Sequence, residues 1–454
     1  MEEVATRIAR LEQTALAPVT KTSRRYYLWV GFLLAVIAWG AYAYSVQLRE
    51  GLVVTGMRDR ISWGLYITTF VFFIGISHAG TLISAILRVT QAKWRTPVTR
   101  MAEFITVVAL ICGAMFVLVD LGRPDRALNV VLHGRWQSPI IWDMVSITTY
   151  LTASIIYLGL PMIPDLALFR DRLAGRAPAW RVWVYRVGAV GWQGSASQKR
   201  SLASAIGVLM ILIIPIAVSV HTVVSWIFAM TLRVPWDSTI FGAFFVAGAI
   251  YSGIAMLIIV MAVLRKVYHL EEYITEKHFV YLGIMLAAFA GIMMYGNISE
   301  YATAGYKLAE GEEFHFRQLF LEQFAGFFWY YFLGGLVLPA LLVLFPWTRN
   351  IAGIVVASGL AVVAMWVERY FIVVAGLRVP VLSYEPSNYA PTWIELSVVA
   401  AGFALFALLI TVFVKIFPII AVWEVAEDLE MAEASPADEH IPLQGALQPG
   451  GGSQ

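Results

Sequence analysis

The sequence predicts an all-α polytopic membrane protein with about ten transmembrane helices. Hydrophobic residues make up 60% of its 454 residues, charged residues only 14%, and the mean hydropathy is +0.74. In an ordinary soluble domain, charged residues are near a quarter of the total. No soluble fold can cover this much apolar surface, so lipid must be part of the solvent.

Each predicted span is an apolar stretch long enough to cross roughly 30 Å of hydrocarbon as a helix. These stretches are 27–47, 63–87, 101–119, 139–163, 202–230, 238–264, 280–299, 325–346, 351–375 and 393–420. Only helices and closed barrels satisfy the backbone in lipid, and barrel strands would be far shorter. An even number of spans places both termini on one side of the membrane.

The positive-inside rule sets the predicted orientation. About 21 of the 32 basic residues lie on the side of the termini, which are therefore expected in the cytoplasm. The longest connection, 164–201, interleaves Trp and Tyr with Arg and Lys, which is typical of an amphipathic segment lying on the membrane surface.

An internal repeat groups spans two to five and six to nine into two related four-helix bundles, with one peripheral helix on either side. When Trp63 is laid over Trp236, the segment 75–80 (GISHAG) coincides with 248–253 (GAIYSG). Glycines at these positions let helix backbones approach closely in lipid.

The predicted organisation follows from these spans and from the composition of the ends. The tail is acidic and then rich in Pro, Gly and Gln, which favours disorder. The expected segments are a cytoplasmic N-terminal segment (1–26), the first helix with its loop (27–62), the first bundle (63–230), the second bundle (231–375), the last helix (376–423) and a disordered acidic cytoplasmic tail (424–454).

The two bundles differ in polarity. His78 in the first bundle is matched by Tyr251 in the second, and Asp143 by Tyr330 at the start of the matching span. Ionisable groups within a membrane are costly and usually functional. This asymmetry indicates that the first bundle is the working half, although His78 could also be a structural hydrogen-bonding residue and Asp143 a helix cap.

Helix length predicts how deep each histidine lies. His78 is about 22 Å from the outer face and His221 about 13 Å, at 1.5 Å per residue, while Asp143 is one turn inside that face. Groups that titrate near neutral pH beneath one face suit the release of protons from a hydrophobic carrier as it is oxidised.

Other polar residues near the outer face are weaker candidates, because each also has a structural interpretation. Arg123 could form an interfacial ion pair with Asp120, and Asp237 could cap a helix. Three further residues, Arg88, Glu103 and Lys415, are expected to extend toward the membrane surface. The weaker candidates are Asp120, Arg123, Asp237, Glu300 and Arg369.

No metal or haem site is predicted. Bis-histidine haem ligation needs two histidines at one depth, and the predicted depths of His78 and His221 differ by about 9 Å. The single cysteine, Cys112, excludes a thiolate cluster, and no histidine pair has metal-binding helical spacing.

Three segments carry a resemblance to a known family: 62–64 (SWG), 75–80 (GISHAG) and 120–124 (DLGRP). Together with the ten spans, they resemble the NrfD/PsrC family of quinone-interacting membrane subunits. Within that family, the ActC subunits of alternative complex III are the most similar type, with the paralogous ActF subunits as the close competitor.

This resemblance implies a quinol-oxidising subunit of a respiratory or photosynthetic complex in the bacterial inner membrane. It implies no covalently bound cofactor, quinol or menaquinol as substrate, and possible proton conduction. The implied partners are c-type cytochromes with haem c, a periplasmic iron–sulfur or molybdopterin-like subunit, and other membrane subunits, whereas nucleic acid is not expected.

The resemblance also assigns roles to residues. His78 matches the family's polar position in its span and Asp143 the acid near the mouth of the quinone site, and His221 is grouped with them as catalytic. The residues expected in quinol binding or a proton path are Asp237, Asp120, Arg123, Glu300 and Arg369.

Two alternative functions remain open at this stage. One is a membrane anchor and quinone-reactive subunit of a molybdopterin oxidoreductase of the polysulfide-reductase type. The other is a secondary transporter, since repeated bundles and buried charges also occur in that class. Copurification with iron–sulfur and haem proteins would favour an oxidoreductase.

Overall fold

The computed structural model describes residues 2–92, 94–231, 233–309, 311–382 and 384–434. Within these ranges, ten helical segments are long and apolar enough to cross a membrane, which confirms the predicted fold class. They are α2 (Arg24–Glu50), α3 (Leu65–Val89), α4 (Thr96–Asp120), α6 (Pro139–Arg172), α8 (Ala196–Ala229), α9 (Phe241–Val267), α10 (Glu276–Lys307), the continuous segment α12–η3–α13 (Ala325–Leu344), α14 (Ile351–Arg378) and α15 (Trp393–Ile416).

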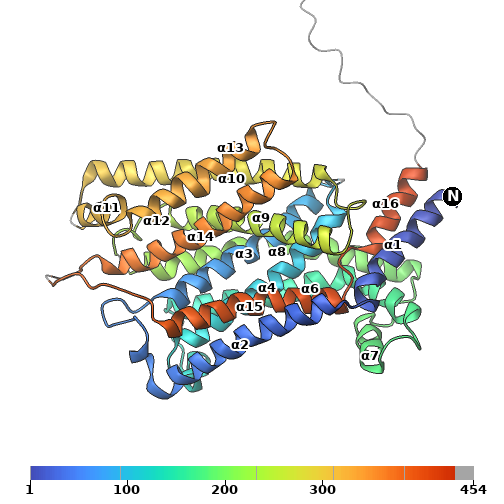
Figure 1. Cartoon of the computed structure of the whole chain (residues 1–454), viewed down its shortest axis with the longest axis horizontal. Coiled ribbons are helices and arrows are strands. Elements are labelled where there is room, and N and C mark those ends of the chain that lie inside the picture. Colours follow the sequence, from blue (N-terminus) through green and yellow to red (C-terminus); the bar gives the residue numbers. More distant parts are fainter. Residues whose placement is uncertain (1, 93, 232, 310, 383, 435–454) are drawn as a thin grey trace, which may run out of the picture.

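Short helices cover the two ends of this assembly. They are α1 (Glu2–Thr20), η1 (Leu52–Val54), η2 (Pro124–Arg126), α5 (Asn129–Leu132), α7 (Ala179–Gly188), α11 (Glu312–Phe320) and α16 (Val422–Ala434). Helices α1, α7 and α16 lie at one end, here called the terminal face, and α5 and α11 lie at the other, the opposite face (Figure 1). Both ends of the described chain are therefore on the same side, as an even number of spans requires.

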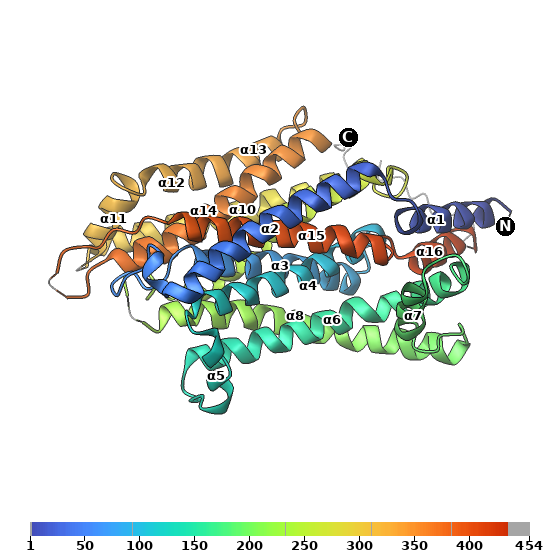
Figure 2. The same ribbon diagram turned by 60° about the horizontal axis from the view of Figure 1, so that its bottom comes forward.

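Two groups of four spanning helices are visible in the packing (Figure 2). In the first group, α3, α4, α6 and α8 contact one another in a ring, and α9, α10, α13 and α14 do the same in the second. The outer pair, α2 and α15, packs together and lies against α3 and α4.

The two groups meet where their first helices cross. Helix α3 packs against α9, and the rings of Trp63 and Trp236, which the repeat aligns, lie 6.4 Å apart. A Cβ atom on Gly80 would come within 1.9 Å of the carbonyl oxygen of Ala102 on α4. This glycine is therefore required for the close approach of α3 and α4.

Three residues expected to extend toward the membrane surface have internal partners near the terminal face; Glu103 and Lys415 are buried and Arg88 is partly buried. Arg88 forms an ion pair with Glu103 at 3.4 Å, and the Ser84 hydroxyl donates to the same carboxylate at 2.6 Å. The Nζ atom of Lys415 donates to the carbonyl oxygens of Pro18 and Lys21 at 2.8 and 2.6 Å. Each charge lies beside an internal partner at the terminal face, which removes the reason to reach solvent.

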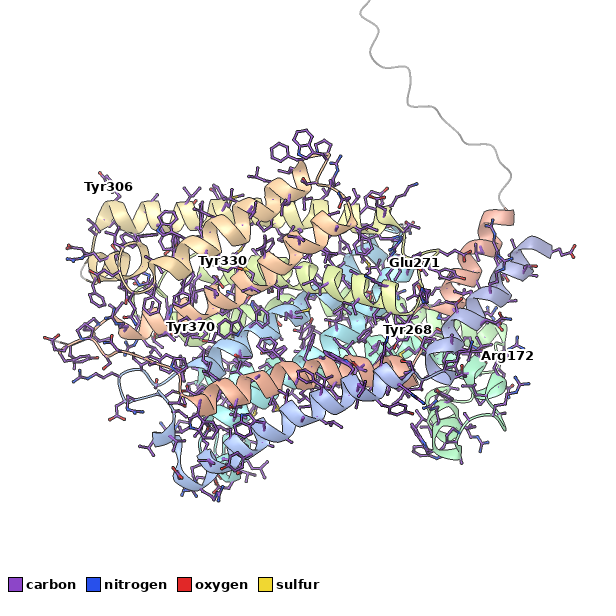
Figure 3. All side chains as sticks on the ribbon, viewed as in Figure 1. Arg172, Tyr268, Glu271, Tyr306, Tyr330 and Tyr370 are labelled. Carbon is purple, nitrogen blue, oxygen red and sulfur yellow. The ribbon has the colours of Figure 1, made fainter. Side chains whose placement is uncertain are left out.

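The chain ends are more ordered than their composition predicts. Helix α1 contacts α16, and Glu12 of α1 accepts a hydrogen bond from Arg172 of α6 at 2.8 Å (Figure 3). Residues 422–434 form α16, so the expected disordered tail from 424 is wrong for this part, and residues 435–454 lie outside the described residues. A short helix can form here because neighbouring helices supply the packing that it lacks alone.

The connection 164–201 contains a surface helix, as expected. In α7, Trp180 and Trp183 are exposed, whereas Tyr185 is buried and donates from its hydroxyl to the carbonyl oxygen of Ile416 at 2.9 Å. Exposed indole rings beside arginines suit the headgroup layer of a membrane.

Candidate functional site

His78 of α3 and His221 of α8 lie in contact, with ring centroids 4.5 Å apart and no exposed surface. The predicted depth difference of about 9 Å is therefore wrong. That prediction counted residues from helix ends assumed to be level. His78 lies 13 residues from the start of α3 and His221 8 residues from the end of α8, so contact between the rings requires these ends to be at different levels or the helices to be tilted. The histidine pair is at the centre of the first four-helix group.

The hydrogen bonds of His78 constrain the position of its ring. Its Nδ1 atom lies 2.9 Å from the carbonyl oxygen of Ile74, and its Nε2 atom is bonded to the carbonyl oxygen of Ala217. Carbonyl oxygens only accept hydrogen bonds, and a neutral imidazole carries a single N–H group. A neutral His78 ring can therefore donate to only one of the two carbonyl oxygens at a time, and its position is set by both.

His221 has the opposite character. Neither of its ring nitrogens has a hydrogen-bond partner among the described residues, and its ring packs on Phe245 with centroids 5.6 Å apart. A buried polar atom without a partner costs about 1–3 kcal/mol. This cost indicates that the ring is kept for a purpose other than packing, such as accepting a proton.

Asp143 lies on the same face of α6 as Tyr150, whose ring packs on His78 at 5.3 Å. Seven residues of helix separate them, so Asp143 is about 10 Å from Tyr150 toward the opposite face. Asp143 is 7% exposed, and its Oδ1 atom has no partner among the described residues. A buried carboxylate oxygen thus lies between the histidine pair and the opposite face.

A groove between α6 and α8 opens on the outside of the helix assembly beside Asp143. Its volume is about 340 Å³, and Trp142, Ser146 and Ser219 contribute to its lining. The rings of Trp142 and Trp226 lie 6.4 Å apart next to it, as expected for an aromatic belt at a membrane boundary. A hydrophobic molecule dissolved in the bilayer can reach this groove laterally.

The second four-helix group contains a buried ion pair that includes Arg369, one of the candidate residues. Glu368 and Arg369 of α14 are each 1% exposed, and Arg369 Nη1 lies 2.8 Å from a carboxylate oxygen of Glu368. The guanidinium also lies 4.5 Å from the centre of the Phe245 ring, the same ring on which His221 packs. Buried ionisable groups therefore lie in both four-helix groups, and the pairing of Arg369 with Glu368 is what the sequence analysis did not predict.

Asp120 and Arg123 do not pair. Arg123 is exposed and forms its ion pair with Asp125 at 2.9 Å, and this hydrogen bond lowers the pKa of Asp125. Asp120 is partly buried at the end of α4, and its Oδ1 atom has no partner among the described residues. The turn after α4 places the arginine toward solvent, which separates the two charges.

Asp237 and Glu300 lie away from the histidine pair. Asp237 is exposed in the loop before α9. Glu300 is partly buried on α10 and accepts a hydrogen bond from the Ser238 hydroxyl at 2.5 Å. Of the candidate residues, the structure thus brings together His78 and His221, with Arg369 beyond Phe245 and Asp143 on the approach.

Among the described residues, no group of three or more His, Cys, Asp or Glu side chains could hold a metal ion. The depth argument against bis-histidine haem no longer applies, because both rings are at one level. The rings nevertheless touch each other, whereas two ligands of one iron are held apart by it. The absence of a cofactor in this chain remains a prediction.

Comparison with known proteins gives relatives along most of the chain. A protein from Halobacterium salinarum, provisionally named as a membrane subunit of dimethyl sulfoxide reductase, is 28% identical over 439 residues, covering 90% of this chain and 95% of the relative. A selenate reductase subunit from Mesobacillus selenatarsenatis is 24% identical and covers 87% and 94%. An Hdr-like menaquinol oxidoreductase integral membrane subunit from Archaeoglobus fulgidus is 25% identical and covers 89% and 97%.

These relatives are subunits of reductases and of a menaquinol oxidoreductase, and two of the three names state that the subunit lies in the membrane. The family model described as "Polysulphide reductase, NrfD" matches residues 53–380, which include all eight helices of the two four-helix groups. With ten membrane-crossing helices and this match over most of its length, the chain is a multi-pass membrane protein that belongs to the NrfD family.

Proposed function

We propose that this chain is the quinol-oxidising membrane subunit of an electron-transfer complex in the bacterial inner membrane. Its similarity to a menaquinol oxidoreductase membrane subunit supports a quinol as the substrate. The termini would face the cytoplasm and the opposite face the periplasm, in keeping with the distribution of basic residues.

The groove between α6 and α8 is the proposed entry for the quinol head group. Its polar lining includes the hydroxyls of Ser146 and Ser219, and Trp142 supplies a flat apolar wall. Asp143 lies on the next face of α6, turned toward the bundle interior, where a proton released in the groove can reach its unpaired oxygen.

Oxidation of a quinol to a quinone releases two protons and two electrons. In the proposed mechanism, Asp143 and His221 accept the protons, and the electrons pass to an iron–sulfur cluster of a partner subunit at the periplasmic face. His78, bonded to two carbonyl oxygens, orients the pair. The observation that carries the proposal is this set of buried, unpaired proton acceptors beside a groove open to lipid.

A second candidate is the reverse direction, in which the chain serves as the quinone-reactive anchor of a reductase. The similarity to a dimethyl sulfoxide reductase membrane subunit and a selenate reductase subunit favours it. The same groove would serve both directions, and in this one the same residues would donate protons to the quinone. Membership of the ActC type, c-type cytochrome partners and proton conduction are narrower proposals, which the proteins that copurify with the chain and proton release by the complex would test.

The experiment is the variant Asp143→Asn in the intact complex, measured as quinol-dependent reduction of an electron acceptor. An amide cannot accept the proton, so we expect turnover to fall by roughly a hundredfold, within the range for a lost general base. Asp171→Asn is the matched control, because Asp171 is an exposed aspartate on the same helix at the terminal face. Equal turnover of both variants and the wild type, with normal assembly, would refute the role of Asp143.

A further inference from the structure

A second and larger groove lies between α6 and α8 near the terminal face, on the edge of the assembly where these two helices run side by side (Figure 2). Its volume is about 850 Å³, larger than the groove beside Asp143. The proposed function makes no use of this groove, because it is at the other end of the two helices.

The lining of this groove changes from polar to apolar along the helix axes. The N-terminal part of α8 contributes Arg200 and the hydroxyls of Ser197, Ser201 and Ser204. The apolar part of the lining, contributed by both helices, consists of Ile156, Leu160, Ala205, Val208 and Leu209.

The membrane boundary falls between these two parts. Trp142 and Trp226, in contact near the opposite face, mark one edge of the hydrocarbon. From there, roughly 30 Å of hydrocarbon takes about 20 residues of helix, which reaches the vicinity of residue 206 on α8 and 162 on α6. Arg200 and the serines thus lie at the level of the lipid headgroups, and Leu160 and Val208 lie inside the acyl region.

Charge complementarity identifies the kind of molecule that fits. The connection 164–201 carries seven basic and two acidic residues, so the headgroup layer around the groove is strongly positive. Among the described residues, Arg200 makes one internal hydrogen bond, from Nε to the carbonyl oxygen of Ala196 at 3.4 Å. Both terminal nitrogens of its guanidinium therefore remain free for a phosphate, which they can bind in a bidentate manner.

We propose that this groove is a binding site for an anionic membrane phospholipid of the leaflet at the terminal face. The phosphate contacts the Arg200 guanidinium and the serine hydroxyls, and the acyl chains lie on Ile156, Leu160 and Val208. A transmembrane helix of a partner would fit less well, because it would bring apolar side chains against a charge and three hydroxyls at the headgroup level.

The test is native mass spectrometry of the delipidated, full-length protein in non-ionic detergent, titrated with phosphatidylglycerol or with phosphatidylcholine of the same chains. We expect the wild type to retain phosphatidylglycerol about tenfold more tightly, the value of one charge-assisted hydrogen bond. Arg200→Gln should abolish this preference and leave phosphatidylcholine binding unchanged. Lys199→Gln, the same loss of charge at the adjacent position outside the lining, should keep the preference.

A second variant tests the apolar part of the site. Ala205→Phe fills the groove and should weaken binding of both lipids by at least about fivefold, since the acyl chains lose their contacts. The proposal fails if Arg200→Gln keeps the preference for phosphatidylglycerol, if Lys199→Gln loses it as Arg200→Gln does, or if Ala205→Phe binds both lipids as the wild type does. It also fails if a photoreactive residue at position 204 crosslinks to another protein of the intact complex and not to lipid.

Discussion

At the scale of single residues, the two buried histidines divide their roles through their hydrogen bonds. His78 faces two acceptors and, among the described residues, His221 faces none. Two positive imidazolium rings at 4.5 Å would repel strongly in a medium of low dielectric constant, so at most one of the two rings can carry a positive charge at a time. The ring nitrogens of His221 have no partner among the described residues, so His221 is the ring that can accept a proton while His78 stays neutral.

Replacement of His221 by leucine separates function from packing. The leucine side chain has a similar volume and removes two unpaired buried nitrogens, so the free energy of unfolding should change by less than about 1.5 kcal/mol. Quinol turnover should fall by at least about tenfold, because the proton acceptor is lost. Thermal unfolding and turnover of the same purified complex check both halves. A strongly destabilised but active variant would mean that His221 is a packing residue.

At the scale of helices, α16 is fastened to the terminal face by charge. Glu424 is 6% exposed and pairs with Arg88 and Arg95, each at 3.0 Å. Asp165 accepts hydrogen bonds from the backbone N–H groups of Val422 and Trp423 at the start of the same helix. Helix α16 thereby covers the ends of α3, α4 and α6 at the terminal face.

The attachment of α16 should depend on pH through Glu424. Burial is the largest single effect and would raise the pKa of this carboxyl, but Arg88, Arg100 and Arg95 together outweigh burial and hold the pKa below its usual value of 4.5. A lowered pKa in the folded state contributes stability that is present above the usual value and is lost as the pH falls through the folded pKa. The protection of the α16 amides from hydrogen exchange, relative to their intrinsic rate at each pH, should therefore stay high between about pH 7 and 5 and fall only below about 4.5.

The variant Glu424→Gln should release α16 already at neutral pH, since the amide cannot pair with either arginine. Glu427→Gln is the control, because Glu427 is exposed on the same helix. If both variants protect α16 as well as the wild type does at neutral pH, the ion pairs do not hold this helix.

At the scale of the whole molecule, the two four-helix groups meet where a few buried polar side chains lie among apolar ones. Arg369 lies on Phe245 of α9, and His221 packs against the same ring from the first group. A Cβ atom on Gly248 would lie 2.8 Å from Arg369 Nη2, so the glycine of the second repeat makes room for this guanidinium. The repeat therefore places a histidine pair in one group and an ion pair in the other, across one aromatic ring.

Removing one partner of the Glu368–Arg369 pair should destabilise the protein much more than removing both, because a single remaining charge has no partner. Arg369→Met leaves a buried carboxylate without a partner and should destabilise the protein by about 3–5 kcal/mol. The double variant Glu368→Gln with Arg369→Met should recover most of that loss, because no charge is left buried. Thermal unfolding in detergent measures both. A double variant as unstable as the single one would show that the arginine acts through packing alone.

Much of the fold could be predicted from the sequence, and less of the site. The ten spans, the surface helix near Trp180 and the importance of His78 follow from apolar length, amphipathic spacing and the cost of a buried polar group. The partners of Arg88 and Glu368 and the contact of His78 with His221 did not follow. Hydropathy describes each helix by itself, and these features depend on which side chain of another helix lies at the same depth.

The sequence by itself thus determined the class of protein, the number of membrane crossings and the ionisable residues whose energetic cost within the membrane indicates a function. The tertiary structure alone decided which of those residues act together: a pair of histidines in contact, an ion pair on the other side of Phe245, and the ion pairs that hold α16. The physical reason is that, within lipid, a charge or a hydrogen-bonding group is stable only beside its partner. The rotation, tilt and depth of packed helices choose that partner, and no single span encodes them.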